Sequence, residues 1–439
     1  MKCGFSKLDI TPALGCHLMG YPNERIADAV LDPLYVRCAA FQEGGTAIFL
    51  CFDLLGIPQG ENHKIREYVA EYVGCEIKDV FVSCTHTHTA PNIYSDYYEK
   101  DTKYINELKH FAAHVAEAAL SDLKEATFCY AKSEVHDISF VRRYRMKDGT
   151  VRTNPGRGNP DVLEPMNPGD DTLQLLRVIR EGAPDVLVVN YQVHPDTVGG
   201  NGICADYPEV VCATLEGALP GTHCLYLNGT AGDLNHININ APAWEPYKGK
   251  IVAEHMGRKI AGEVLAIYSY AQPIATGAVK TVEQVVPLAL KRPTQEELER
   301  SQEIMRLHWA GELEPILQTK VGMERIIYLM EAKNIVDVHG EGTERSVWVN
   351  GASLGDICLV GMPGEPFCEV GKQIREMSPF AVQFVMGQTN GMEGYFPTAD
   401  AFAVNGYESR TSKFKPGVAE TLIAAGQAAT QALFEAKEE

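Results

Sequence analysis

The hydrophobic positions of this chain fall into short apolar, β-prone runs that alternate with longer helical segments. The β-prone runs predict strands at 34–38, 46–51, 79–84, 185–192, 222–227, 356–361 and 381–386. Helices are predicted at 59–73, 101–123, 208–219, 246–270, 294–310 and 415–436. Such alternation is typical of layered α/β proteins. We therefore expect an α/β fold with a mixed, layered sheet and flanking helices.

With 439 residues and no internal repeat, the chain could form one large α/β domain or two smaller ones, and we expect a single large domain over 1–439. Two segments interrupt its regular pattern. A charged helical region at 294–335 could form a small subdomain or a lid. The stretch 148–171 is rich in Gly, Pro and Asn and predicts a long loop of the kind that often covers a site.

The net charge and the composition of the chain indicate which partners and which cellular location to expect. A formal net charge of −19 argues against nucleic acid, because a polyanion would be repelled. Residues 1–10 lack the apolar core of a signal peptide, and no later run predicts a membrane span. The 12 cysteines are scattered, as expected of free thiols in a reducing compartment. We expect a cytoplasmic protein with a small-molecule substrate; the oligomeric state stays open.

Several predicted strands run directly into polar side chains that can bind a metal or a substrate. In open α/β sheets, ligands bind beyond the carboxyl ends of the strands, so these side chains could converge there. The strands at 79–84, 185–192, 222–227, 356–361 and 381–386 are followed by His86 and His88, by His194, by Asp233, Asn235 and His236, by Glu365, and by Tyr395, respectively.

The pair His86 and His88 is the most informative of these. Residues spaced i, i+2 at the end of a strand point to the same face, so both rings can reach one atom. Taken alone, this spacing fits a metal site and a pair of packed surface histidines equally well. Two or three histidines with one carboxylate are the usual donors of a catalytic zinc, which acidifies water to a pKa of about 7 and polarises a carbonyl oxygen. That chemistry hydrolyses amides and esters.

Together, these motifs resemble the neutral ceramidases, which hydrolyse the amide of N-acyl sphingosines with zinc. The resemblance rests on Thr85-His86-Thr87-His88 with Pro91, on His194, on Gly229-Thr230-Ala231-Gly232-Asp233, on Pro363-Gly364-Glu365, and on Asn390-Gly391 followed by Gly394-Tyr395. It implies that His86, His194, Glu365 and Tyr395 ligate zinc, with His88 beside the metal. It also implies that Arg142 lines the substrate site.

The chain departs from the family at two points. Asn235 stands where the family has a serine, and an amide cannot act as a nucleophile, so activation of water falls to the metal. The chain also has neither a secretion signal nor room for the family's extra C-terminal β-domain. We therefore expect a small polar N-acyl substrate rather than ceramide.

The remaining candidate residues follow from this interpretation. We assign His88, Asn235 and Asp233 to catalysis, with His88 or a nearby carboxylate carrying the proton to the leaving amine. Arg142, Arg143 and His236 are assigned to substrate binding, because two arginines beside a glycine-rich loop suit an anionic substrate group. Asp233 and His236 could instead only order their loop.

Other interpretations remain open. A zinc esterase or lactonase would use the same site as an amidase. A non-catalytic binding protein with a decayed site is favoured by the missing serine and disfavoured by the four retained ligands. Individually, Glu365 could be a solvated turn residue and Tyr395 a packed aromatic.

Overall fold

The computed structural model describes residues 1–94, 98–320 and 322–438. Its largest element is a mixed sheet in which β12 and β14, and likewise β4 and β5, pair in parallel while the other neighbours along the sheet are antiparallel. The sheet order is β14 (Thr222–Asn228), β12 (Asp185–Tyr191), β11 (Thr172–Arg180), β6 (Lys124–Glu134), β1 (Lys2–Asp9), β3 (Tyr35–Gln42), β4 (Thr46–Phe52) and β5 (Val80–Cys84), with β16 (Gln272–Pro273) beside β6.

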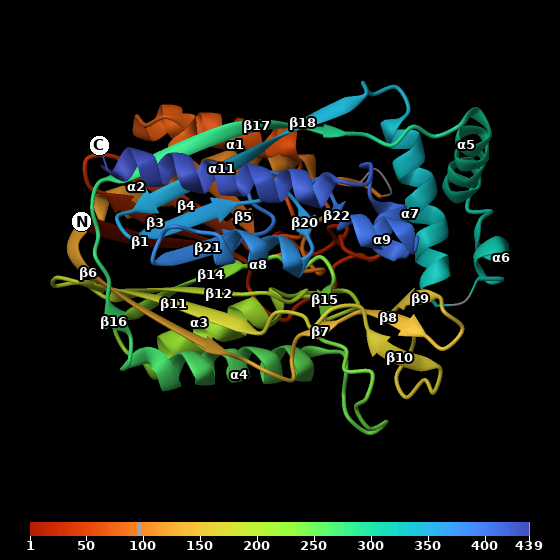
Figure 1. Ribbon diagram of the computed structural model, residues 1–439, viewed down its shortest axis with the longest axis horizontal. Helices are drawn as coiled ribbons and strands as arrows, with labels where there is room; N and C mark the ends of the chain where they lie inside the picture. The colour runs from red at the N-terminus through yellow and green to blue at the C-terminus, as the bar shows by residue number, and fades with distance from the viewer. Residues whose placement is uncertain (95–97, 321, 439) are drawn as a thin grey trace.

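A second, smaller sheet packs against one face of the first (Figure 1). Its order is β17 (Val279–Ala289), β18 (Glu344–Leu354), β19 (Ile357–Gly361) and β21 (Val382–Met386), and β19 pairs with β21 in parallel. The alternation of side chains along each strand places one apolar set between the sheets. Phe49 and Phe81 of the large sheet meet Leu359 and Phe384 of the small one in this buried layer.

Helices cover the outer faces of both sheets, which gives a helix–sheet–sheet–helix order. The large sheet packs against α1 (Gln59–Val73) and α2 (Thr102–Ser121) on one half and against α3 (Asp206–Ala218) and α4 (Lys250–Tyr268) on the other. The small sheet is covered by α8 (Cys368–Glu376) and α11 (Val418–Glu438), as Figure 1 shows. The expectation of a mixed, layered α/β fold is confirmed.

The region 294–335 is helical, as expected. It contains α5 (Gln295–Trp309), α6 (Glu314–Leu317) and α7 (Met323–Val338), which share a small apolar cluster that includes Ile304 and Leu329. Residue 321, inside this region, lies outside the described residues. Whether these helices act as a subdomain or a lid stays a prediction.

The predicted strands and the six predicted helices are all present, with bounds that differ by a few residues. Five long strands were not predicted: β1, β6, β11, β17 and β18. The long ordered or semi-ordered loop predicted over 148–171 contains two short strands, β9 (Val151–Thr153) and β10 (Val162–Pro165), which pair with β8 (Arg143–Met146). Turn-forming residues separate these short strands and obscured them.

The large sheet curls so that its edge strand β14 approaches β5 at the opposite edge. The loop after β21 joins the two. The Gly387 N–H donates to the Asn228 carbonyl at 3.0 Å, and the Cys84 N–H donates to the Gln388 carbonyl at 3.1 Å. The carboxyl ends of β5, β14 and β21 therefore lie side by side.

The short elements near these strand ends are β7 (Phe140–Val141), β15 (Leu234–Asn235), β20 (Glu365–Pro366), β22 (Tyr395–Phe396), α9 (Ala399–Ala403) and α10 (Tyr407–Thr411); β2 (Ala29–Val30) pairs with β13 (Gly202–Ile203). A bilayer-crossing helix must be long and apolar. None of the helices in the described part of the chain meets that requirement.

Candidate metal centre

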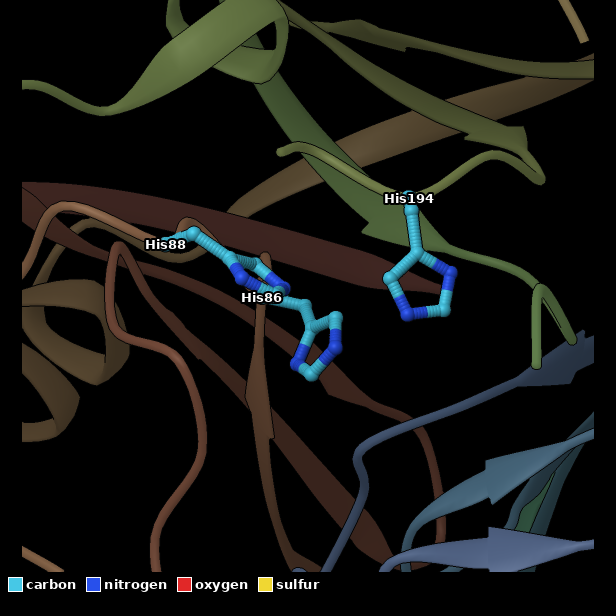
Figure 2. A group of neighbouring side chains, drawn as sticks. All are labelled: His86, His88 and His194. Atoms are coloured by element: carbon cyan, nitrogen blue, oxygen red, sulfur yellow. The ribbon is translucent and has the colours of Figure 1, made fainter. Parts of the chain in front are cut away.

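Three histidines meet beyond the carboxyl ends of β5 and β12. His86, His88 and His194 each offer one ring nitrogen, and these atoms lie within 4.8 Å of one another. Figure 2 shows the three rings turned toward a common space, two from the segment after β5 and one from the segment after β12. The expectation that the polar residues after the strands converge therefore holds for these three.

Each of the three rings is oriented by a backbone carbonyl at its Nδ1 atom. A carbonyl can only accept a hydrogen bond, so each Nδ1 carries the proton and each Nε2 presents a lone pair. A metal-binding histidine is usually oriented by a hydrogen bond of this kind, made by the ring nitrogen that does not bind the metal. The carbonyls are those of Leu55, 2.6 Å from His86, Gly20, 2.9 Å from His88, and Ala231, 2.8 Å from His194.

The backbone at His86 is strained. Its φ of 77° lies in the left-handed region, which costs a residue with a side chain about 1–3 kcal/mol. The strained turn is held because the His86 N–H donates to the Leu54 carbonyl at 2.9 Å. The strand before it is fixed by Asn390, whose side-chain oxygen accepts the Val82 N–H at 2.8 Å. Strain retained in this way clusters at functional sites.

Glu365 completes the centre with a buried carboxylate. Its Oε2 lies 3.0 Å from Nε2 of His194 and 3.4 Å from Nε2 of His86. Burial disfavours its charge, but His86 and His194 outweigh burial and hold the pKa of this carboxyl well below its usual range. Since both Nε2 atoms present lone pairs, either an extra proton or a cation must lie between them and the carboxylate.

The donor set fits zinc. Nε2 of His86 and Nε2 of His88 are buried, and neither has a hydrogen-bond partner among the described residues. Burial lowers the pKa of His88 to about 3, so its ring is neutral at physiological pH. Neutral imidazoles with one carboxylate are the ligands that a catalytic zinc prefers. The residues present could therefore hold this metal.

Tyr395 lies at the side of the centre. Its ring centroid is 6.4 Å from that of His194, and the Arg142 guanidinium lies 5.2 Å from its centroid. Burial raises the pKa of this phenol well above its usual range, although Arg142 opposes the shift. Its role as a ligand, which would require loss of that proton, stays a prediction.

Both arginine side chains are buried, and their roles in substrate binding stay predictions. The Arg142 Nε donates to the Glu408 carboxylate at 2.7 Å, and its terminal nitrogen donates to the Gly232 carbonyl at 2.6 Å. Arg143 is also buried, and its guanidinium lies 5.0 Å from the ring centroid of Phe367. Nothing in the sequence around Glu408 marks it as a counterion, so sequence reasoning missed it.

Asp233 and Asn235 hold the loop that follows β14. The two carboxylate oxygens of Asp233 accept the Cys368 N–H at 2.8 Å and the Asn167 amide at 2.8 Å. The Asn235 amide donates to the side-chain oxygen of Asn154 at 2.7 Å. These contacts order the loop; direct roles of Asp233 and Asn235 in catalysis stay predictions.

His236 is buried between two neighbouring segments. Its Nδ1 lies 3.0 Å from an Asp196 carboxylate oxygen, and its Nε2 lies 2.8 Å from the Tyr247 carbonyl. Burial opposes its charge, but Asp196 outweighs burial and raises the pKa of His236. Both ring nitrogens are engaged within the protein, so a role in substrate binding stays a prediction.

The fold of the chain is shared with solved ceramidase structures. A neutral ceramidase from Pseudomonas aeruginosa superposes with a TM-score of 0.75 and 18% identity over 99% of this chain and 74% of that one. A ceramidase complexed with C2 gives a TM-score of 0.74 and 18% identity over 99% of this chain and 75% of that one. No protein-family model and no curated protein matches the chain. The protein therefore has a ceramidase-like fold.

Proposed function

We propose that the protein is a zinc-dependent hydrolase that cleaves an N-acyl amide bond in a small polar substrate. One observation carries this proposal: three histidines whose Nδ1 atoms are fixed by carbonyls aim their Nε2 lone pairs toward one space, beside the buried carboxylate of Glu365. All of these buried groups accept hydrogen bonds and none donates one, so their burial costs free energy unless a cation lies between them. The ceramidase-like fold supports the choice of an amide as the bond cleaved.

The proposed ligands are His86, His194, Glu365 and Tyr395, with His88 alongside. When bound, zinc would lower the pKa of water and polarise the scissile carbonyl. His88 is half-buried and its Nε2 faces the centre, so we assign to it the transfer of a proton from the attacking water to the leaving amine. Asp233 and Asn235 would keep the loop beside the centre in place through their contacts.

The side chains that surround the centre restrict which substrates can bind there. The Arg142 guanidinium is held by Glu408 and lies against the rings of Tyr395 and Tyr407, where it can orient a carbonyl without moving. A fixed, buried donor of this kind stabilises charge that develops on a substrate oxygen. We propose a cytoplasmic location, which suits cysteines that are all free.

Metal analysis of the purified protein tests the proposal. We expect about one zinc per chain, and loss of both zinc and hydrolysis of N-acyl amides in His86→Ala, His194→Ala and Glu365→Gln. His110→Ala is the matched control, because this half-buried histidine on α2 contacts Tyr68 and none of the proposed ligands that the structure describes. A panel of N-acyl amides, esters and lactones identifies the bond cleaved. Wild-type protein without bound metal, or His86→Ala that keeps both properties, would contradict the proposal.

A further inference from the structure

The segment Cys204-Ala205-Asp206 lies between the two loops that supply the histidines. It follows β13 and leads into α3, and none of its side chains belongs to the proposed ligand set. The segment 86–89 comes from the end of β5 and the segment 194–198 from the end of β12, so the two loops belong to different halves of the curled sheet. Their relative position therefore depends on what connects them.

Cys204 binds the first of these loops through its backbone. Its carbonyl accepts the hydroxyls of Thr87, at 2.6 Å, and of Thr89, at 2.9 Å. Its N–H donates to the Thr89 carbonyl at 3.3 Å, so the two residues form a β-bridge. These threonines alternate with His86 and His88. The hydroxyl bonds of the two threonines therefore anchor the backbone on both sides of His88 and directly after His86.

Asp206 binds the second loop through its carboxylate. One oxygen accepts the N–H groups of Thr197, at 3.0 Å, and Val198, at 3.1 Å, and the other accepts the Thr197 hydroxyl at 2.8 Å. The side chain is fully buried. Three hydrogen bonds thus join this one buried side chain to residues 197 and 198. This carboxylate therefore fixes the segment that begins at His194.

Asp206 also has a left-handed backbone, with φ of 59°. For a residue with a side chain this conformation costs about 1–3 kcal/mol and persists only where surrounding contacts impose it. The strained turn directs the carboxylate toward Thr197 while the Cys204 carbonyl, two residues earlier, faces the threonines. A regular helix start would not require this geometry.

We propose that Asp206 is a positioning residue, and that the brace Cys204–Asp206 holds the segment carrying His86 and His88 at a fixed distance from His194. The brace rests on the proposed function, in that it preorganises the metal centre. Residues that orient ligands typically contribute 10- to 100-fold to metal affinity. The brace would thus set how tightly zinc binds without touching it.

Chelator competition on the full chain tests the brace. In Asp206→Asn, which replaces an acceptor oxygen by a donor amide, we expect zinc to bind about 10- to 100-fold more weakly. Thr197→Val removes a single bond and should give a smaller loss in a variant that folds normally. Asp122→Asn is the control, because Asp122 accepts the Phe5 N–H at 3.1 Å at the far end of α2. Unchanged zinc affinity in both site variants would overturn the proposal.

Amide hydrogen exchange on metal-free protein separates this inference from the proposed function. If the brace exists, Asp206→Asn raises exchange at 86–89 as well as at 194–198, although Asp206 makes no hydrogen bond to 86–89 that the described residues show. Exchange that rises only at 194–198 would overturn the brace. Wild-type protein that binds no zinc but shows the coupled exchange would refute the zinc hydrolase and leave the brace standing.

Discussion

Glu365 and Tyr395 are direct partners in the short parallel ladder between β20 and β22. The Glu365 N–H donates to the Gly394 carbonyl at 2.9 Å, which fixes the register of the pair. The carboxylate and the phenol therefore reach the metal centre from one rigid backbone unit. Substitutions of the two side chains can therefore be compared directly, because neither should shift the backbone that carries the other.

Tyr395→Phe tests the phenol as a ligand. The ring keeps its contacts with Arg142 and Tyr407, so the melting temperature of the metal-free protein should change little. If the oxygen ligates zinc, affinity falls about tenfold or more, as measured by chelator competition. Tyr130→Phe, which removes a hydroxyl bonded to Gln174, is the control. Unaltered affinity with reduced turnover would mean that the phenol serves the substrate and not the metal.

Arg142→Met tests whether the arginine is needed for the fold. Its removal leaves the fully buried Glu408 without a counterion, so we expect a loss of about 3–5 kcal/mol in the free energy of unfolding. The double variant Arg142→Met/Glu408→Gln should recover much of that loss. Denaturant titration measures both.

The control for this pair is Arg145→Met, whose partner Glu164 is exposed. Exposed ion pairs contribute at most about 1 kcal/mol, so this change should have little effect on stability. If the double variant is stable but inactive, Arg142 acts on the substrate as well. If Arg142→Met alone is as stable as wild type, the buried ion pair between Arg142 and Glu408 does not stabilise the fold.

Asn235→Ser introduces the residue type that the resemblance to the ceramidases implies at this position. The variant loses the bond to Asn154, which we expect to reduce stability by about 1 kcal/mol. Activity should stay within about tenfold of wild type, because the proposed mechanism needs no nucleophile at this position. Steady-state kinetics with the best N-acyl substrate measures the activity of the variant and of the wild type. A rise in kcat of about a hundredfold or more would show that a hydroxyl nucleophile is what this chain lacks.

Lys291 should make stability depend on alkaline pH. Burial lowers its pKa from 10.5 to about 8, with Glu331 opposing the shift. Between these values the unfolded chain holds the proton that the folded chain has released, so stability rises as the pH rises through this window. Relative to Lys291→Met, the gain from about pH 7.5 to about pH 9.5 should be about 2 kcal/mol.

Urea titrations at both pH values measure this difference. Lys413→Met is the control, since Lys413 is a neighbouring lysine whose carbonyl accepts the Lys291 N–H at 2.9 Å. A difference between wild type and Lys291→Met that does not change with pH would show that the ammonium group is better solvated than its surroundings indicate. The carbonyls of Ser409 and Arg410, which accept its protons, would then be the reason.

The sequence predicted the buried strands better than the half-exposed ones. Val80–Cys84 and Asp185–Tyr191 are mostly apolar because both faces are covered, and such runs are distinctive. Strand β6 (Lys124–Glu134) mixes charged and apolar residues because it is partly exposed, and it was missed. Strand β17 contains Pro287 and several polar residues, which also obscured it.

The candidate site, like the fold, could be predicted only in part from the sequence. His86, His88 and His194 follow recognisable strands, so their convergence could be expected. The positions of Glu408 and Asp206 could not, because their partners lie far away in the sequence or are backbone groups that carry no sequence signal. Contacts of this kind depend on how the sheet curls, and its curl is set by the packing of all the layers.

The wide separation of the proposed ligands along the chain has a consequence for folding. Residues 86, 194, 365 and 395 come together only after both sheets have formed and the loop after β21 has joined β5 to β14. Pairings between such distant segments form late and slowly. Zinc would therefore not nucleate folding; it would bind a nearly finished molecule and, by mass action, oppose its global unfolding.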